Sequence, residues 1–268
     1  MSMNPFDRQA PIPGVKNIIV VGSGKGGVGK STVSANLAVA LKNEGKSVGL
    51  LDADIYGPSI PRMFGAINQT LQINENQKMQ PIVRHGLRLM SMGFIVNENQ
   101  AVVWRGPMLF KAFDQFFRDV EWGELDFLII DLPPGTGDVA LTIAQKVPVS
   151  CGIVVCTPQN LALLDAKKAM DMFNQVRIPL FGVIENMAYF IPPGSDERVQ
   201  LFPKGELDSY LDLHGVKKLA ELPFDPQVGL TSEAGMPLGV SAQDHPTSQL
   251  FQNIAQELIR NNKFGADK

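Results

Sequence analysis

Residues 24–31 have the composition and the order of a phosphate-binding loop. They read GKGGVGKS and match the pattern G-x-x-x-x-G-K-[ST], between a predicted strand and a predicted helix. Glycines let backbone N–H groups turn toward phosphate oxygens, and the start of the helix presents the positive end of its dipole to the same anion. Lys30 can then reach the β- and γ-phosphates of ATP, and the Ser31 hydroxyl can ligate Mg²⁺. The predicted nucleotide-binding residues of this loop are Gly24, Gly26, Gly27, Val28, Gly29, Lys30, Ser31 and Thr32.

Three aspartates follow two apolar segments that we predict to be strands. Asp52 and Asp54 come after residues 48–51, and Asp131 ends the run FLIID. The carboxyl ends of parallel strands form the ligand crevice of an open α/β sheet, so all three can face the phosphates. We expect Asp131 and Asp52, with Ser31, to hold Mg²⁺. Asp54 is the candidate for orienting the attacking water, and support of the loop is its alternative role.

The apolar segments predict the elements that position these residues. Candidate strands at 17–21, 48–51, 87–92, 127–131, 151–155 and 180–184 mostly lack polar alternation, and candidate helices lie at 31–43, 108–120, 161–176, 211–220 and 247–261. Strands of this kind separated by helices favour a parallel sheet covered on both faces. Residues 55–80 and 188–210 are expected to be irregular. The predicted fold is therefore a single α/β P-loop domain with a mainly parallel sheet flanked by helices.

Composition and charge restrict the class of protein further. The chain has 268 residues with 24 Lys and Arg against 27 Asp and Glu, so it lacks the basic excess typical of nucleic-acid binding. No apolar stretch reaches the roughly 20 residues that span a bilayer, and two cysteines form no disulfide framework. We expect a cytoplasmic protein that binds neither nucleic acid nor membrane. Its predicted parts are a flexible lead-in at 1–16, the domain at 17–263 and a tail at 264–268.

Several motifs taken together resemble the Mrp/ApbC family of P-loop ATPases. They are GSGKGGVGKST, LLDADIYGPSIPRMFG, VVWRGPML, FLIIDLPPGTGD, ENMAYF and ELPFDPQV. Members of that family are iron–sulfur cluster carriers or scaffolds, in the deviant Walker A group that includes MinD, ParA and the nitrogenase iron protein. Many members have a small additional N-terminal domain, and we expect none ahead of the loop here.

The resemblance implies roles for residues that the spacing alone does not assign. It implies a homodimer that sandwiches two ATP molecules, with Lys25 acting on the partner's nucleotide, so the predicted catalytic residues are Lys25, Lys30 and Asp54. It also implies base contacts near Asn186, Pro223 and Asp225. For Asn186, a turn residue that closes its strand is the alternative. The Gly135 N–H, in the Pro-Pro-Gly-Thr-Gly segment after Asp131, is a candidate sensor of the γ-phosphate.

The chain departs from the family at the iron–sulfur site. Members usually hold a bridging cluster through a Cys-x-x-Cys pair shortly after the ENM segment, where this chain has Pro192 and Ser195. Proline has no ligating atom, and iron–sulfur clusters are held by thiolates. Cys151 and Cys156 lie five apart on one predicted strand, so their side chains are expected on opposite faces as buried apolar groups.

Two functions follow as hypotheses. The first is an ATPase in iron–sulfur assembly or transfer to apoproteins, without the usual cysteine ligands. The second is a positioning or partitioning switch of the MinD/ParA type, which would need a membrane or DNA surface. Apolar residues of the last predicted helix, Leu250 to Ile259, could form such a surface, but the segment has few basic residues beside them, and packing on the core is the simpler interpretation.

Overall fold

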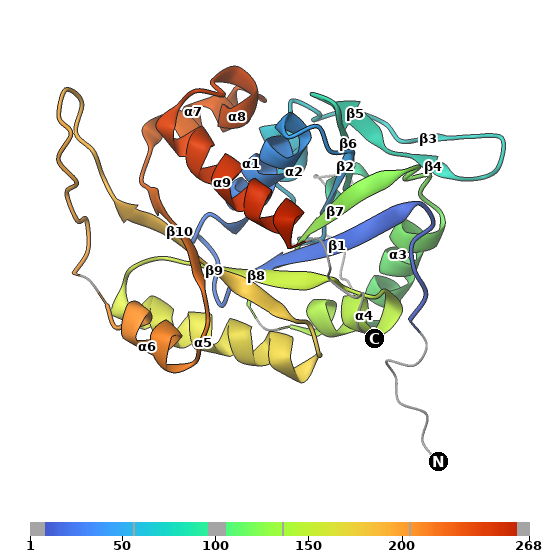
Figure 1. Ribbon diagram of the computed structural model, residues 1–268. Coiled ribbons are helices and arrows are strands. Elements are labelled where there is room, and N and C mark those ends of the chain that lie inside the picture. The colour runs from blue at the N-terminus through green and yellow to red at the C-terminus, as the bar shows by residue number, and fades with distance from the viewer. Residues whose placement is uncertain (1–8, 56, 96–105, 136, 204, 262–268) are drawn as a thin grey trace, which may run out of the picture.

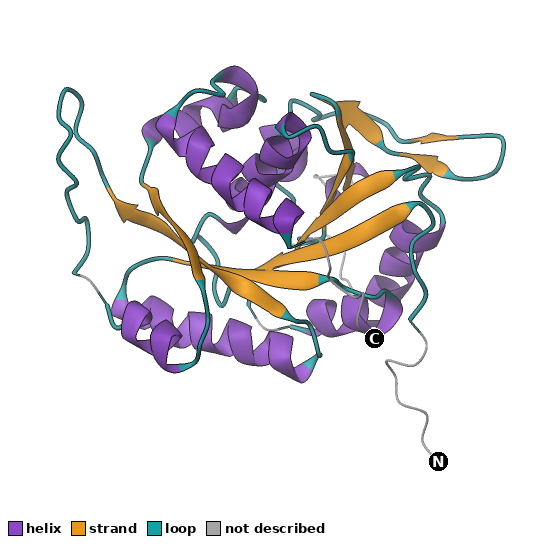
Figure 2. Cartoon of the chain, viewed as in Figure 1, coloured by secondary structure: helices purple, strands orange, loops and turns teal. Residues whose placement is uncertain are grey.

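An eight-stranded sheet forms the centre of the molecule (Figures 1 and 2). The computed structural model describes residues 9–55, 57–95, 106–135, 137–203 and 205–261. Its strands are β1 (Val15–Gly22), β2 (Val48–Asp52), β5 (Ile82–Arg84), β6 (Leu87–Ser91), β7 (Leu125–Asp131), β8 (Cys151–Cys156), β9 (Leu180–Tyr189) and β10 (Lys218–Pro223). Their order is β10-β9-β8-β1-β7-β2-β6-β5, and every pair is parallel except β5 with β6.

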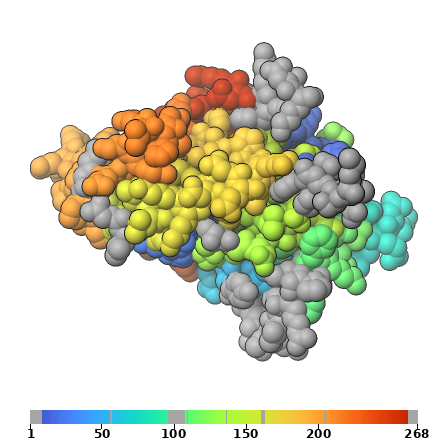
Figure 3. All heavy atoms as spheres, turned by 90° about the horizontal axis from the view of Figure 1, so that it is seen from below, coloured from blue at the N-terminus to red at the C-terminus, as the bar shows by residue number. Residues whose placement is uncertain are grey.

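Helices cover both faces of this sheet, as the sequence predicts. On one face lie α1 (Lys30–Asn43), α2 (Ile60–Met63), α7 (Pro226–Glu233), α8 (Leu238–Ser241) and α9 (Pro246–Arg260). On the other lie α3 (Gly106–Arg118), α4 (Asp138–Lys146), α5 (Asn160–Gln175) and α6 (Leu207–Leu213), and Figure 3 shows this second face. Each face has its own apolar core, one built on α1 and α9 and one on α3, α4 and α5.

The strand register brings the site residues to one edge. Asp131 pairs with Val21 of β1 on one side and with Asp52 of β2 on the other. Because these strands are parallel, Asp52, Asp131 and the loop after β1 meet at the carboxyl edge of the sheet. The phosphate loop and the two aspartates are therefore neighbours.

The last helix packs on the core. Phe251, Ile254 and Leu258 of α9 are buried, in contact with α1 and β10. This confirms core packing as the role of the apolar residues near the C-terminus. No helix in the described part of the chain is long and apolar enough to cross a membrane.

Two predicted segments differ from the structure. The predicted helix at 211–220 is wrong, because α6 ends at Leu213, Gly215 adopts a left-handed conformation that stops the helix, and residues 218–223 pair with β9 as β10. The region 55–80, expected to be irregular, contains α2 and a short antiparallel pair, β3 (Gln72–Ile73) and β4 (Met79–Gln80).

The described part of the predicted lead-in, residues 9–16, and the second long loop are also more ordered than expected. Ile12 is buried, and the Arg118 guanidinium donates to the carbonyls of Ala10 and Pro11. In the segment 188–210, β9 continues to Tyr189 and Phe190 pairs with Val199, which makes a hairpin. Residues 1–8, 96–105, 136 and 262–268, including part of the VVWRGPML motif and the predicted tail, lie outside the described residues.

Candidate functional site

The phosphate loop joins β1 to α1, which begins at Lys30, one residue before the predicted start. Two of its glycines are required by close neighbours. A Cβ on Gly24 would lie 2.0 Å from the Asp165 carbonyl oxygen, and one on Gly29, which has φ +81°, would lie 2.3 Å from Asn186 Nδ2. The loop is therefore held between α5 and β9, so that only glycine fits at these two positions.

A buried ion pair lies at the start of α1. Lys30 Nζ is 2.8 Å from Asp131 Oδ1, and the two side chains are 6% and 0% exposed. The Ser31 hydroxyl donates to Asp131 Oδ2 at 2.6 Å, and the Ser34 hydroxyl donates to Oδ1 at 2.7 Å. The loop lysine thus neutralises the aspartate expected to serve Mg²⁺, and two hydroxyls satisfy the same carboxylate.

Asp52 lies beside this pair, fully buried. Its carboxylate accepts hydrogen bonds from the backbone N–H groups of Asp54 and Ile60 and from the Ser91 hydroxyl, each at 3.1 Å. Burial first, and repulsion from Asp131 second, raise the pKa of Asp52 to about 7. Hydroxyl and carboxylate oxygens of Ser31, Asp52 and Asp131 form a donor set that suits Mg²⁺.

The remaining predicted catalytic groups lie around the loop. Asp54 lines the cavity and accepts from the Gly57 N–H at 3.2 Å. Lys25 Nζ lies 3.9 Å from Asp165 Oδ2, and its side chain is about one third exposed. The Gly135 N–H, a candidate phosphate sensor, instead donates to the Ser23 carbonyl at 2.9 Å in this structure.

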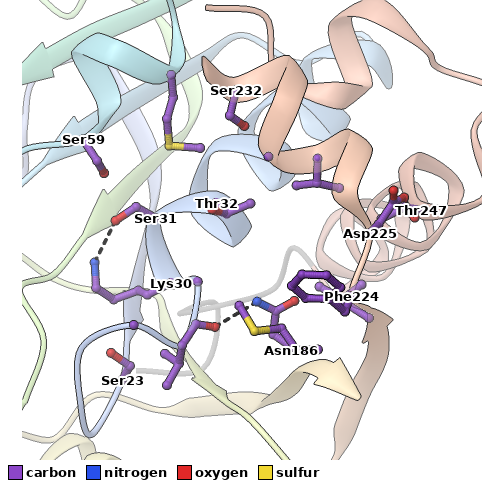
Figure 4. Close-up of a pocket in the computed structure, with 18 of the residues that line it drawn as sticks. Ser23, Lys30, Ser31, Thr32, Ser59, Asn186, Phe224, Asp225, Ser232 and Thr247 are labelled. Carbon is purple, nitrogen blue, oxygen red and sulfur yellow. Dashed lines mark hydrogen bonds between the residues drawn. The ribbon is translucent and has the colours of Figure 1, made fainter. Parts of the chain in front are cut away.

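A cavity of about 790 Å³ runs from the phosphate loop to the C-terminal elements. Figure 4 shows Lys30, Ser31 and Ser59 on one side of it and Asn186, Phe224, Asp225 and Thr247 on the other. The volume is in the range of small-molecule and cofactor sites. The structure therefore brings the predicted nucleotide-binding residues, including Pro223, to one cavity, except Gly24, which packs against the Asp165 backbone instead of lining it.

Asn186 and Asp225 both make structural contacts inside this cavity. Asn186 Nδ2 donates to the Val28 carbonyl at 2.8 Å, which leaves the amide one further N–H and its oxygen. The Asp225 carboxylate caps α7 by accepting from the Gln227 N–H at 2.9 Å, and it accepts from the Thr247 hydroxyl at 2.6 Å. Asp225 thus ties α7 to α9 at the edge of the site.

The sequence reasoning missed several residues of the site. Ser34 and Ser91 contact the two buried aspartates, and Phe224 exposes part of its ring to the cavity. Ser34 could have been found, because a residue four after Lys30 lies on the same face of the helix. Ser91 ends a neighbouring parallel strand, but its pairing with β2 is a long-range feature that a local pattern does not report.

The cysteines are placed as predicted, apart from each other and away from solvent. Cys151 lies in the core on the α1 face and Cys156 in the core on the α5 face. Burial raises the pKa of both thiols to about 12, which disfavours the thiolate that a metal needs. Pro192 and Ser195 lie in the turn of the hairpin that follows β9, where the Ser195 N–H donates to the Pro192 carbonyl.

Fold and site together define a class of protein. A parallel sheet, a glycine-rich loop that opens a helix with Lys30 and Ser31, and an aspartate at the end of the adjacent strand are the parts of a P-loop NTPase.

Comparison with known proteins agrees and gives the family. A model described as the NUBPL iron-transfer P-loop NTPase matches residues 14–259. An iron-sulfur cluster carrier protein of Aquifex aeolicus is 48% identical, over 96% of this chain and 71% of that protein. An iron-sulfur cluster transfer protein of Dictyostelium discoideum is 42% identical, over 96% and 80%. A nucleotide-binding protein from Archaeoglobus fulgidus, solved in complex with ADP, is 34% identical, with a TM-score of 0.76 over 94% of this chain and 97% of that one.

The chain therefore belongs to the family of NUBPL iron-transfer P-loop NTPases, and the resemblance stated from its motifs is confirmed.

The raised pKa of Asp52 predicts how stability depends on pH. Between about pH 4 and pH 7 the folded protein keeps a proton on Asp52 that the unfolded chain has lost. The free energy of unfolding of the nucleotide-free protein in EDTA should therefore fall as pH rises through this window, by up to about 1.4 kcal/mol per pH unit. Urea denaturation at each pH measures it. Asp52→Asn cannot ionise and should flatten the profile; an unchanged slope in this variant would assign the dependence to another group.

Proposed function

We propose that this protein binds Mg·ATP in the cavity and hydrolyses its γ-phosphate by in-line attack of water. The observation that carries the proposal is the buried arrangement of Lys30, Ser31 and Asp131 at the head of α1. When the triphosphate binds, its oxygens offer Lys30 a new anionic partner, and Asp131 and Ser31 become free to serve the metal. Mg²⁺ would neutralise charge that develops on the phosphate oxygens.

The protein groups then stabilise the developing charge and orient the attacking water. Backbone N–H groups of the loop and the Lys30 ammonium stabilise the spreading charge on the phosphate oxygens. Asp54 lines the same cavity and is our candidate for orienting the attacking water, with Asp52 in support of the Mg²⁺ shell. We place this activity in the cytoplasm.

We further propose that Lys25 acts on the nucleotide of a second copy in a homodimer. The Lys25 ammonium lies 3.9 Å from the Asp165 carboxylate, and the Lys25 side chain is partly exposed. The buried ion pair with Asp131 is made by Lys30 instead. A lysine at the surface of the loop can approach a facing protomer. The deviant form of the loop, GKGGVGKS, supports this role.

Mixing two inactive variants tests this arrangement. Lys25→Ala homodimers would lack the lysine in trans at both sites, and Lys30→Gln homodimers would lack the loop lysine while an amide still donates to Asp131. In a mixed dimer the Lys25→Ala protomer keeps Lys30 in its own loop, and its partner supplies Lys25 in trans. Phosphate release should therefore be near zero for each variant alone and should return on mixing.

The outcomes separate the parts of the proposal. No recovery on mixing, with both variants folded by circular dichroism and dimeric with ATP, would contradict action in trans. Full turnover by Lys30→Gln would contradict the assignment of the site itself. Lys42→Ala, at the far end of α1, is the matched lysine control and should hydrolyse ATP like the wild type.

For the base, we propose that Asn186, with the Pro223–Asp225 segment, contacts adenine. The amide of Asn186 keeps one N–H and its oxygen after donating to Val28, so it can both donate to and accept from the adenine edge. Asn186→Ala should therefore reduce the preference for ATP over GTP in competition titrations, because one base contact is lost. An unchanged preference would leave Asn186 with its bond to the loop as its role.

The ATPase cycle, we propose, serves iron–sulfur cluster assembly or transfer to apoproteins. Membership of an iron-transfer family and the names of the Aquifex and Dictyostelium relatives support this role. The residues of this chain do not fit a cluster at the usual position, since Pro192 and Ser195 offer no thiolate and both cysteines are buried. We therefore propose that the thiolates come from an iron–sulfur assembly partner or an apoprotein.

Anaerobic reconstitution with iron and sulfide tests this division of labour. The purified wild type should show no sulfur-to-iron charge-transfer absorbance and no stoichiometric iron. The double variant Pro192→Cys/Ser195→Cys restores the family's pair in the same turn and should gain both signals. Stoichiometric iron and sulfide on the wild type would contradict the proposal and would show that the chain has cluster ligands of its own.

A further inference from the structure

Two hydroxyl groups that line the nucleotide cavity have no hydrogen-bond partner. Ser59 Oγ, at the start of α2, and Ser232 Oγ, on α7, are among the few side-chain oxygens in the described part of the chain that are buried and unsatisfied. Ser232 is 8% exposed. A buried hydroxyl without a partner is costly, so an unsatisfied hydroxyl in a ligand cavity indicates a group that the ligand completes.

The position of Ser232 along α7 indicates which part of the nucleotide lies next to its hydroxyl. Helix α7 starts at its cap Asp225, on the Asn186 side of the cavity, and contacts α2 toward the metal side. Seven residues of helix place Ser232 about 10 Å from that cap. Figure 4 shows Ser232 on the wall between Ser59 on one side and Asp225 on the other, with its hydroxyl directed toward α1. This is the middle of a nucleotide whose phosphates lie at Lys30 and whose base lies at Asn186.

The residues of α7 next to Ser232 leave room for a polar ring of a bound ligand beside the Ser232 hydroxyl. Val228 and Gly229 precede Ser232 by four and three residues, lie on the same face and also line the cavity. A Cβ on Gly229 would meet no atom within 4 Å, so the space beside the Ser232 hydroxyl is open. Neither residue carries a polar side chain that could satisfy this hydroxyl in place of a ligand.

The far end of α7 is fixed, so Ser232 is presented rigidly. A Cβ on Gly235 would lie 2.7 Å from Gly65 Cα, which means that the two backbones touch where α2 and α7 end. His85 Nε2 is 3.0 Å from the Gly235 carbonyl oxygen. With Asp225 bound to Thr247 at its other end, α7 is held at both ends.

We propose that Ser232 binds a hydroxyl of the nucleotide's ribose and so makes the site selective for ribonucleotides over deoxyribonucleotides. A serine hydroxyl and a ribose hydroxyl each donate and accept, and the bond satisfies the buried Ser232 oxygen. A site built to bind a substrate hydroxyl discriminates against the analogue that lacks it, because its own polar group is left unpaired. This inference depends on the proposed binding of ATP and refines it.

Titration of the full-length protein with Mg²⁺ complexes of ATP, 2′-deoxy-ATP and 3′-deoxy-ATP tests the assignment. The wild type should bind ATP on the order of tenfold more tightly than at least one deoxynucleotide. Ser232→Ala should lose about that factor for ATP and nothing for the disfavoured deoxynucleotide, so the discrimination disappears. Ser59→Ala, which removes the other unpartnered hydroxyl of the cavity, should keep the ribose discrimination.

The nucleotide-free variant gives a second readout. Removing an unpartnered buried hydroxyl should leave the melting temperature of Ser232→Ala equal to or above that of the wild type, whereas a hydroxyl with a structural partner would lower it. A lowered melting temperature would overturn the inference.

Three binding results would also overturn it. The first is an equal affinity of the wild type for all three nucleotides. The second is an equal loss of affinity for all three in Ser232→Ala, which would indicate a phosphate contact. The third is no loss of affinity at all in that variant. Binding of none of the nucleotides by the wild type would instead remove the proposed function, and the inference with it.

Discussion

The arrangement of the site depends on one buried ion pair, between Lys30 of the phosphate loop and Asp131 of the adjacent strand. Removing one member of a buried pair leaves an uncompensated charge at a cost of about 3–5 kcal/mol. Three features hold the ion pair in place. They are the register that aligns β7 with β1 and β2, the Ser31 and Ser34 hydroxyls that bond to Asp131, and the glycines that let the loop approach the sheet. Without nucleotide, the lysine and the aspartate satisfy each other; a triphosphate with its metal can satisfy both separately.

Strand β9 carries Asn186, at the proposed base end of the cavity, and leads into the hairpin where the resemblance to the family places cluster ligands. Asn186 of β9 is bonded to the loop at Val28, and three residues later the Tyr189 carbonyl accepts from the Phe224 N–H at 2.7 Å. Phe190, at the base of the hairpin, packs edge-on against the Phe224 ring. A nucleotide bound at Asn186 and the Pro223–Asp225 segment, as proposed, would therefore touch residues that anchor the hairpin, which gives a short physical route from the nucleotide to the proposed cluster position.

Much of this site could be predicted because it is local in sequence. The loop motif, the strand-ending aspartates and the apolar strands each report their role within a few residues, and their placement at one sheet edge follows from parallel topology. The rest depends on tertiary contacts. The segment after Leu213 has enough apolar residues for a helix, yet pairing with β9 makes it a strand. Ser91 and Ser232 look like ordinary serines until the fold sets one against Asp52 and the other, unpartnered, at a cavity wall.

The proposed nucleotide site and the hairpin that holds Pro192 and Ser195 are separable on physical grounds. The groups that we propose for the nucleotide lie on the loop, at the carboxyl edge of the sheet and on α7, and none of them is a cysteine. The two thiols lie in different cores, and burial raises their pKa values to about 12. Metal binding by these thiols would require the sheet packing to open on both faces. In contrast, Pro192 and Ser195 lie half-buried in one turn of the hairpin, which follows directly from β9. Substitution there changes what the hairpin can hold and leaves the ion pair at Lys30 untouched, so the proposed nucleotide site does not depend on cysteines at positions 192 and 195.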